Sequence, residues 1–479
     1  MTEMFFKFTS TFLFCGLTTG LFAQTLQSEA LNLAKKFQIS PDKLSILTVK
    51  VGGKKETLID INSNKKLTLA SLSKVVTSYS VLQNFSLDHQ FITRIKTDGR
   101  IVNSTLEGNL YLIGGGDPSF GPEGMSELIL ALKKKGVKKI TGDIIVDDSY
   151  FDNVRYDESR GDKRADFIYD APVGAMSYNW NSIKVTITPG KNGEKAKVDV
   201  FPPNDYVRVS GHIRTKSGRS NDVIAERRRK KNGENILLLR GSLGQGHGSL
   251  VFERNITDPD LWSGHNLIYG LKKQGISISG KILNGVAPSA GLALAEYRGK
   301  NTLGILSDLN KDSNNHVAEM LAKAIAVKNH KQGSIFEGVK IINQETKSLA
   351  MTPQGYSFVS PSGLSPQNQI SSANMLKILQ GIASNKQQHE VFMQSLPVAG
   401  VDGTLKKRKI ASTKVEWVKA KTGFITGAIA LGGYAKKNDG TLVAFSFIYN
   451  GSDKEQRVTD FYDHLIAEIM DKDNSISIH

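Results

Sequence analysis

The chain has 479 residues, with 62 lysines and arginines against 46 aspartates and glutamates, which gives a formal net charge of +16 at pH 7. A single hydrophobic core rarely serves so long a chain, so we expect roughly two to three domains. The only cysteine, Cys15, excludes a disulfide within the chain and a metal site built from several thiolates. The 9 histidines form no His-Glu-x-x-His pattern, so neither a metal nor another cofactor is expected.

Residues 1–23 have the pattern of a secretory signal peptide, with a basic leading region, an apolar run from Phe8 to Phe22, and Ala23 before the expected cleavage site. Phe14 stands before Cys15 where a lipoprotein signal needs a small residue, which argues against lipid anchoring. No other stretch approaches the ~20 apolar residues of a membrane span. We therefore expect an exported protein, periplasmic or secreted, that keeps no transmembrane anchor after signal removal.

The first elements predicted after the signal are one helix and two strands, over Leu26–Phe37, Leu44–Val51 and Leu58–Ile61. Next comes an apolar stretch, Leu69–Leu82, whose length and lack of proline and glycine favour a buried helix. Ser71 and Lys74 would share one face of that helix, because positions three apart do so. Burial disfavours a charged lysine, and a neutral Lys74 can take the proton of Ser71 as a general base.

The same pair, taken alone, also fits a serine that caps a helix and a solvated lysine one turn later. Two further Ser-x-x-Lys copies are set aside, because Ser40–Lys43 contains a proline and Ser63–Lys66 lies in a polar turn. The Ser71 motif therefore indicates catalysis only in combination with the other motifs of the chain.

The central part of the chain is predicted to be rich in strands, broken by glycine, asparagine, proline and basic residues, which indicates hairpins of one or two small subdomains. The predicted strands are Ile140–Val146, Ile183–Thr188, Val198–Val200, Tyr206–Ile213 and Asn235–Leu243. The string Gly114–Gly116 matches no nucleotide-binding pattern and is interpreted as a turn. The basic run Arg227–Lys231 is interpreted as a solvated loop or hairpin; attraction to an anionic wall polymer or a membrane surface is the alternative, and export argues against nucleic acid.

Ser313 and Asn315 stand between two helical patterns, Leu303–Leu309 and Val317–Val327. One interpretation is simply that Ser313, Asn314 or Asn315 caps the second helix. The functional interpretation gives the Ser313 hydroxyl a proton relay to a leaving amine, and the Asn315 amide a hydrogen bond to the backbone of a bound peptide.

Lys421, Thr422 and Gly423 precede two apolar runs, Ala428–Tyr434 and Leu442–Tyr449, which are predicted to be neighbouring antiparallel strands. The Lys421 charge and the Thr422 hydroxyl could hold the carboxylate of a peptide, while Gly423 lets a substrate backbone approach closely. The structural alternative is an edge-strand lysine and a turn glycine. Apolar residues recur at helical spacing from Val458 to Met470, so a last helix should pack its apolar face on the sheet.

In this order, Ser71-x-x-Lys74, Ser313-x-Asn315 and Lys421-Thr422-Gly423 resemble the motifs of the class C low-molecular-mass penicillin-binding proteins, the D-alanyl-D-alanine carboxypeptidase and endopeptidase family. The resemblance covers nearly all of the mature chain, and four more strings carry it: Gly108–Pro118, Tyr169–Ala175, Ser362–Ser365 and Leu396–Leu405. The wide gap between Lys74 and Ser313 favours this family over simple β-lactamases, which place their second motif far sooner.

The resemblance implies a mixed α/β penicillin-binding and β-lactamase-like transpeptidase domain, with an antiparallel sheet flanked by helices and interrupted by inserted β-rich subdomains. We expect the catalytic domain over 24–90 and 290–479, and the insertion over 91–289. By the same resemblance, an acidic residue in the stretch Val146–Phe151, which we take to be Asp147, contacts the free amino group of a diamino acid in the wall peptide, although a carboxylate in a β-turn is the plainer interpretation.

Two departures from the family pattern stand out: Phe424 where a small hydroxyl residue is usual, and Ser360–Pro361 where an Asp-Gly is more usual. The backbone N–H of Phe424 can still complete an oxyanion hole with that of Ser71, since a main-chain donor does not depend on the side chain. Its ring offers no hydroxyl to a substrate carboxylate. We therefore expect weaker recognition of a terminal D-alanine and a preference for cross-links.

The predicted function is hydrolysis of peptidoglycan stem peptides or cross-links through an acyl-enzyme on Ser71, with β-lactam antibiotics as covalent inhibitors. Two alternatives stay open: a penicillin-binding wall sensor that acylates without turnover, and a β-lactamase or esterase of the same fold. The intact Lys74 argues against the first, and the large insertion argues against the second.

Overall fold

The computed structural model describes residues 26–52, 56–230, 234–411 and 415–471, which fall into two compact units. The first unit combines Met1–Gln83, Leu306–Ser313 and Ile342–His479, and the second combines Asn84–Ile305 and Asn314–Ile341. The predicted signal peptide and Cys15 lie outside the described residues. Among the described helices, none has both the length and the apolarity needed to cross a membrane. The domain boundaries given above stay a prediction, since residues 290–305 and 314–341 cluster with the central part of the chain.

The first unit is built on a five-stranded sheet with the order β2-β1-β25-β24-β23. All of its neighbouring strands are antiparallel. The strands span Leu44–Lys50 (β1), Thr57–Ile61 (β2), Val418–Ile425 (β23), Ala428–Lys436 (β24) and Leu442–Asn450 (β25). Strands β24 and β25 are buried along almost their whole length, which explains why they are continuous apolar runs rather than alternating patterns.

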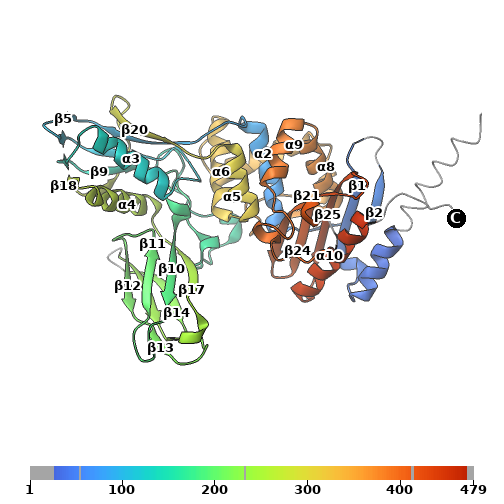
Figure 1. The fold of residues 1–479 in the computed structure, drawn as a ribbon. Coiled ribbons are helices and arrows are strands. Elements are labelled where there is room, and N and C mark those ends of the chain that lie inside the picture. Colours follow the sequence, from blue (N-terminus) through green and yellow to red (C-terminus); the bar gives the residue numbers. More distant parts are fainter. Residues whose placement is uncertain (1–25, 53–55, 231–233, 412–414, 472–479) are drawn as a thin grey trace, which may run out of the picture. The chain divides into compact units, whose positions relative to one another are not determined.

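Helices cover both faces of this sheet. Helix α10, Glu455–Asp471, lies against β24 (Figure 1) and shares a buried apolar cluster with the sheet and the helix over 26–36. Its buried residues include every apolar position predicted for the last helix, from Val458 to Met470, so that prediction is confirmed. On the other face, α8, Ser372–Ala383, contacts β1 and β25.

The remaining elements of the first unit are short or helical. They are η1 Pro41–Lys43, β3 Lys66–Thr68, η2 Ala70–Ser73, α2 Lys74–Asn84, η7 Pro353–Gly355, β21 Tyr356–Ser357, β22 Gln369–Ser371, α9 Lys386–Ser395, η8 Gly403–Leu405 and η9 Val415–Trp417. Strands β21, β22 and β3 form a small antiparallel sheet. Helices α5, Thr302–Lys311, and α7, Ile335–Lys347, contribute residues to both units.

The second unit contains several small sheets around one apolar cluster. Their orders are β19-β9-β7-β4-β20, β18-β8-β6-β5, β11-β10-β17, β12-β15-β14 and β13-β16. The strands are β4 Ile92–Thr97, β5 Arg100–Val102, β6 Thr105–Glu107, β7 Leu110–Ile113, β8 Lys139–Ile140, β9 Ile144–Asp147, β10 Ser182–Thr188, β11 Lys197–Phe201, β12 Val207–Gly211, β13 Arg214–Lys216, β14 Ile224–Arg229, β15 Asn235–Arg240, β16 Ser242–Gly244, β17 Leu250–Asn255, β18 Ser277–Ile278, β19 Ile282–Asn284 and β20 Leu292–Arg298.

The second unit also has helices, which the prediction of a strand-rich insertion missed. They are α3 Pro122–Lys134, α4 Pro259–Lys273, α6 Asn315–Lys328 and the short turns η3 Glu158–Arg160, η4 Ile168–Asp170, η5 Asn179–Asn181 and η6 Gln245–His247. Both α3 and α4 open with a proline, whose fixed φ suits the first helical turn. The predicted hairpins are found in part, since β10 pairs with β11 and β14 with β15 in antiparallel fashion. β7 pairs with β9 and β12 with β15 in parallel, and such pairs need a crossover between the strands.

The basic run lies mostly on β14, in an antiparallel pair with β15, so the hairpin interpretation is confirmed for its described residues. Each described cation of the run has a polar partner. The Arg227 Nε donates to the Asn255 Oδ1 over 2.9 Å, and the ion pairs are Arg228–Glu226 at 2.5 Å, Arg229–Asp258 at 3.3 Å and Lys230–Glu234 at 2.9 Å. Lys231 lies outside the described residues.

His316 on α6 is only 2% exposed, and both of its ring nitrogens are buried without a hydrogen-bond partner among the described residues. Burial lowers the pKa of His316 to about 3, because the imidazolium would lose its hydration. The unfolded chain takes up this proton near pH 6.5, whereas the folded chain does not until about pH 3. His316 therefore destabilises the fold progressively as the pH falls from about 6.5 toward 3.

Replacing His316 with leucine should remove this acid sensitivity. We expect the variant to gain thermal stability relative to the parent between pH 7 and pH 4, by up to several kcal/mol, since each pKa unit is worth about 1.4 kcal/mol. The measurement is Tm against pH for both proteins, with His247→Leu, at an exposed position, as the control. A stability difference that stays constant over this range would contradict the prediction.

Candidate active site

Ser71 and Lys74 lie at the junction of the 3-10 turn η2 and the helix α2. The sequence predicted one helix opening near Ser71; the structure instead has η2 over Ala70–Ser73, and α2 starts at Lys74. The two side chains still meet, because positions i and i+3 eclipse in a 3-10 turn. The distance from Lys74 Nζ to Ser71 Oγ is 3.0 Å. Ala70 has a φ of 49°, an uncommon value for a residue with a Cβ, and it is the residue immediately before Ser71.

The Lys74 side chain is fully buried, and its Nζ also donates to the Ser362 carbonyl oxygen over 2.7 Å. The segment that carries this carbonyl is fixed to the same turn and helix by two more hydrogen bonds. The Thr77 hydroxyl donates to the Pro361 carbonyl over 2.8 Å, and the Asn368 amide donates to the Ser73 hydroxyl over 2.9 Å. The sequence singled out Ser362–Ser365 only as a matching string; the structure gives it a contact with the lysine.

Ser313 and Lys421 form a second serine–lysine pair in the first unit. The Lys421 Nζ donates to the Ser313 Oγ and to the Thr422 carbonyl, each over 2.8 Å. Lys421 is fully buried, and the loss of hydration lowers the pKa of its ammonium to about 7. Ser313 has a φ of 53°, in the left-handed region, so the short connection between α5 and α6 turns sharply at this residue. The residue that caps α6 is Asn314, whose side chain accepts from the Val317 N–H over 3.2 Å.

Strand β23 is an edge strand, and its side chains alternate between the two faces of the sheet. Lys421 and Gly423 face the side of η2, and a Cβ on Gly423 would lie only 2.2 Å from the Leu69 carbonyl oxygen and 2.9 Å from the Leu72 nitrogen. Glycine at this position therefore lets the strand approach the turn that carries Ser71. The side chains of Thr422 and Phe424 take the opposite face, and the ring of Phe424 is 54% exposed.

The loop before β23 contacts Thr422 on the strand and Lys311 at the end of α5. The sequence had assigned no residue of this loop to a site. The Thr422 hydroxyl donates to the Thr404 hydroxyl over 2.9 Å. Asp402 accepts from Lys311 Nζ over 2.5 Å and from the Val398 N–H over 2.8 Å. Lys311 ends α5, two residues before Ser313, so the loop links the Ser313 turn to Thr422. Asp402 and Thr404 belong to the string Leu396–Leu405, which carries the family resemblance but whose residues had no predicted function.

Asn315 and Asp147 belong to the second unit. The Asn315 amide donates to the Tyr169 carbonyl over 3.0 Å, so it ties α6 to another of the strings that carry the resemblance. Asp147 is 5% exposed, and its carboxylate accepts from the Ser149 N–H at 3.0 Å, the Ser149 hydroxyl at 2.6 Å and the Ala287 N–H at 2.8 Å. These contacts are those of a carboxylate that organises a turn. Its recognition of a diamino acid stays a prediction.

The first unit can thus place a serine hydroxyl beside a buried amine in two ways, Ser71 with Lys74 and Ser313 with Lys421. A buried lysine without its proton is a base for the hydroxyl it contacts, which is the requirement for activating a serine nucleophile. Within the described residues, there is no group of three or more histidine, cysteine or acidic side chains that could hold a metal ion.

Relatives of this chain are known in sequence and in structure. It is 28% identical over 411 residues to the D-alanyl-D-alanine carboxypeptidase of Actinomadura sp. (strain R39), covering 83% of this chain and 76% of the relative. It is also 28% identical over 411 residues to the D-alanyl-D-alanine carboxypeptidase DacB of Haemophilus influenzae, covering 83% of each protein.

The solved structure of penicillin-binding protein 4 from Haemophilus influenzae superimposes with a TM-score of 0.76 at 24% identity, over 92% of this chain and 99% of that one. A peptidoglycan endopeptidase from Bdellovibrio bacteriovorus gives a TM-score of 0.52 at 15% identity, over 89% and 92% of the two chains. These likenesses confirm the predicted penicillin-binding fold. Residues 31–468 match the family model described as D-Ala-D-Ala carboxypeptidase 3 (S13), so the chain belongs to the D-Ala-D-Ala carboxypeptidase 3 (S13) family.

Proposed function

We propose that this protein is a serine-type D-Ala-D-Ala carboxypeptidase and endopeptidase that hydrolyses peptidoglycan stem peptides and their cross-links. The observation that carries the proposal is the 3.0 Å contact between the buried Lys74 Nζ and the Ser71 Oγ, in a chain of the S13 family. The predicted signal peptide supports a periplasmic or secreted location, where such a substrate is found.

In the first step, Lys74 takes the proton of Ser71, and the Ser71 oxygen attacks the carbonyl carbon of a D-alanyl residue. The backbone N–H groups of Ser71 and Phe424 hold the oxyanion that forms. The bond from carbon to the leaving nitrogen then breaks, and Ser313, backed by Lys421, passes a proton to the departing amine.

In the second step, a water molecule attacks the acyl carbon, and its proton passes to Ser313 and Lys421, which had given one to the amine. The bond to Ser71 then breaks, and the serine oxygen takes back the proton held by Lys74, which restores the starting state. A β-lactam acylates the same oxygen, and its ring-opened product leaves slowly because the amine stays tethered near the ester.

The other predicted site residues complete the proposed substrate contacts. The Asn315 amide contacts the peptide backbone, and the Lys421 ammonium and Thr422 hydroxyl contact a carboxylate on the leaving side. Gly423 gives the substrate room along the edge strand, and Asp147 is assigned to the amino group of the diamino acid. Because Phe424 brings no hydroxyl, we expect cross-links to be cleaved more efficiently than pentapeptides are trimmed. A higher kcat/KM on pentapeptide monomers than on cross-linked dimers would contradict this preference.

The function is tested by incubating the mature protein and its Ser71→Ala variant with purified pentapeptide monomers and cross-linked dimers, followed by mass analysis. We expect loss of one alanine from monomers and conversion of dimers to monomers by the parent protein alone. Labelling by fluorescent penicillin without turnover of either substrate would favour the wall sensor, and rapid hydrolysis of nitrocefin would favour the β-lactamase. Normal penicillin labelling of Ser71→Ala would exclude Ser71 as the nucleophile.

Gly423→Ala should slow acylation, because its Cβ would collide with backbone atoms of the Ser71 turn at 2.2 and 2.9 Å. Displacing a reacting group by about 1 Å can cost about a hundredfold in rate, so we expect penicillin labelling to slow by at least about tenfold. The matched control is Gly432→Ala on β24, whose Cβ would meet the flexible end of Leu72 at 3.0 and 3.3 Å and the Phe445 carbonyl oxygen at an ordinary contact distance of 3.5 Å. Equal labelling rates for the two variants would show that the close approach at Gly423 is not needed.

The pKa of Lys421, about 7, predicts a pH effect on binding of a substrate carboxylate. Raising the pH through 7 discharges Lys421 in the free enzyme, so kcat/KM on a pentapeptide should fall with an apparent pKa near 7. Lys421→Arg should keep its charge, because a guanidinium titrates only above about pH 12, and should lose this decline. A substrate with an amidated carboxyl end should also lack it. A decline that persists with the amidated substrate but is lost in Lys421→Arg would assign it to proton delivery through Ser313 rather than to carboxylate binding, and one that persists in both would assign it to another group.

A further inference from the structure

A groove of about 630 Å³ lies in the first unit beside the end of β23. It is bounded by Thr422 and Phe424 on the strand, by the loop residues Lys407 and Lys409, and by the first turns of α10. The catalytic pairs do not line it. Thr422 and Phe424 point to this side because they alternate with Lys421 and Gly423, which face the turn of Ser71. The edge strand therefore has the serine–lysine pairs on one side and the groove on the other.

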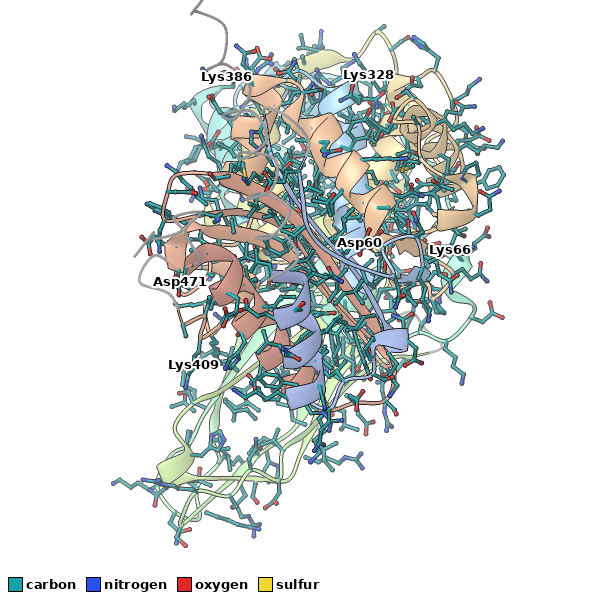
Figure 2. All side chains as sticks on the ribbon, turned by 90° about the vertical axis from the view of Figure 1, so that its right-hand side faces the viewer. Asp60, Lys66, Lys328, Lys386, Lys409 and Asp471 are labelled. Atoms are coloured by element: carbon teal, nitrogen blue, oxygen red, sulfur yellow. The ribbon has the colours of Figure 1, made fainter. Side chains whose placement is uncertain are left out.

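The groove has walls of opposite charge. Lys407 and Lys409 are exposed on the loop wall (Lys409 is labelled in Figure 2), and Glu455 and Asp460 stand on the α10 wall. Asp460 accepts from the Gln456 amide over 2.7 Å, within its own helix. The exposed lysines on the loop wall suit a ligand that carries carboxylates.

The base of the groove is a closed ion pair that fixes its two walls. Arg408 Nε donates to the Asp463 Oδ1 over 2.7 Å, and the Arg408 side chain also donates to the Thr459 carbonyl over 3.2 Å. The two side chains are 14% and 9% exposed, so this pair is largely withdrawn from solvent. The loop is thereby held against α10, and the groove lies between them.

We propose that this groove binds the peptide on the leaving side of the scissile bond, that is, the strand released when a cross-link is cut. The proposal rests on the function proposed above, in which Thr422 contacts a carboxylate on that side. A leaving strand that continues past Thr422 crosses the edge of β23 and enters the groove. There its carboxylates meet Lys407 and Lys409, and its apolar portion packs on the exposed ring of Phe424.

The groove also gives the Phe424 ring a function in the choice of substrate. A small hydroxyl residue at this position would favour a substrate that ends in a carboxylate, whereas an exposed ring favours a substrate with more chain to cover it. A pentapeptide monomer loses only one alanine and has nothing to place in the groove. A cross-linked dimer has a whole stem peptide on that side, so the groove should distinguish the two substrates.

The test measures binding without turnover, in the Ser71→Ala protein, of a fluorescently labelled cross-linked dimer and a labelled pentapeptide monomer. Reversing the loop charges with Lys407→Glu and Lys409→Glu together should weaken dimer binding at least about tenfold, because the attraction between the lysines and the ligand carboxylates is lost. The affinity of this variant for the dimer should depend no more steeply on salt concentration than that of the parent. The fold-loss of affinity for the monomer should be at least about fivefold smaller than the fold-loss for the dimer. The matched control is Lys406→Glu, an exposed neighbour on the same loop that does not line the groove.

Dimer affinity that is unchanged by the double reversal, or lowered equally for dimer and monomer or equally by Lys406→Glu, would overturn the groove assignment. Failure of the proposed function has a different signature: the unmodified protein would cut neither substrate, whatever the binding experiment shows. The two conclusions can therefore fail separately.

Discussion

The chemistry proposed for this protein depends on one buried amine. Lys74 has no exposed surface, and its Nζ lies between the Ser71 hydroxyl at 3.0 Å and the Ser362 carbonyl at 2.7 Å. The carbonyl gives the amine a fixed acceptor, so the nitrogen stays directed at the serine rather than swinging through its rotamers. Two stretches of the chain, one with Ser71 and Lys74 and the other with Ser362, 288 residues beyond Lys74, must come together before this contact can form.

The edge strand β23 is the second constraint, because it borders the serine turn and the groove at once. Gly423 permits the backbone approach to η2, and the alternation of a strand then sends Thr422 and Phe424 to the other side. Lys421 links the strand to the Ser313 turn, while Thr422 links it to Thr404. One short segment thus connects the Ser71 turn, the Ser313 turn and the loop of Thr404, through a glycine, a lysine and a hydroxyl residue in turn.

Sequence reasoning was strongest where the residues themselves restrict the structure. The uninterrupted apolar runs at Ala428–Tyr434 and Leu442–Tyr449 became the central strands, and the helical periodicity from Val458 became α10. It was weakest in the second unit, where α3 and α4 were missed and parallel strand pairs were expected to be hairpins. Short strands of two to seven residues carry little periodicity, and pairing between distant segments leaves no local signal.

The sequence by itself determined the family, the order of the three motifs and the residue types that the chemistry needs, because these depend on side-chain chemistry at fixed local spacing. Only the tertiary structure decided that Ser362 offers its carbonyl to Lys74, that Lys421 is buried against Ser313, and that Asp402 joins its loop to Lys311. Each of these contacts joins residues far apart along the chain. Their distances follow from the packing of helices on the sheet, which no local pattern encodes.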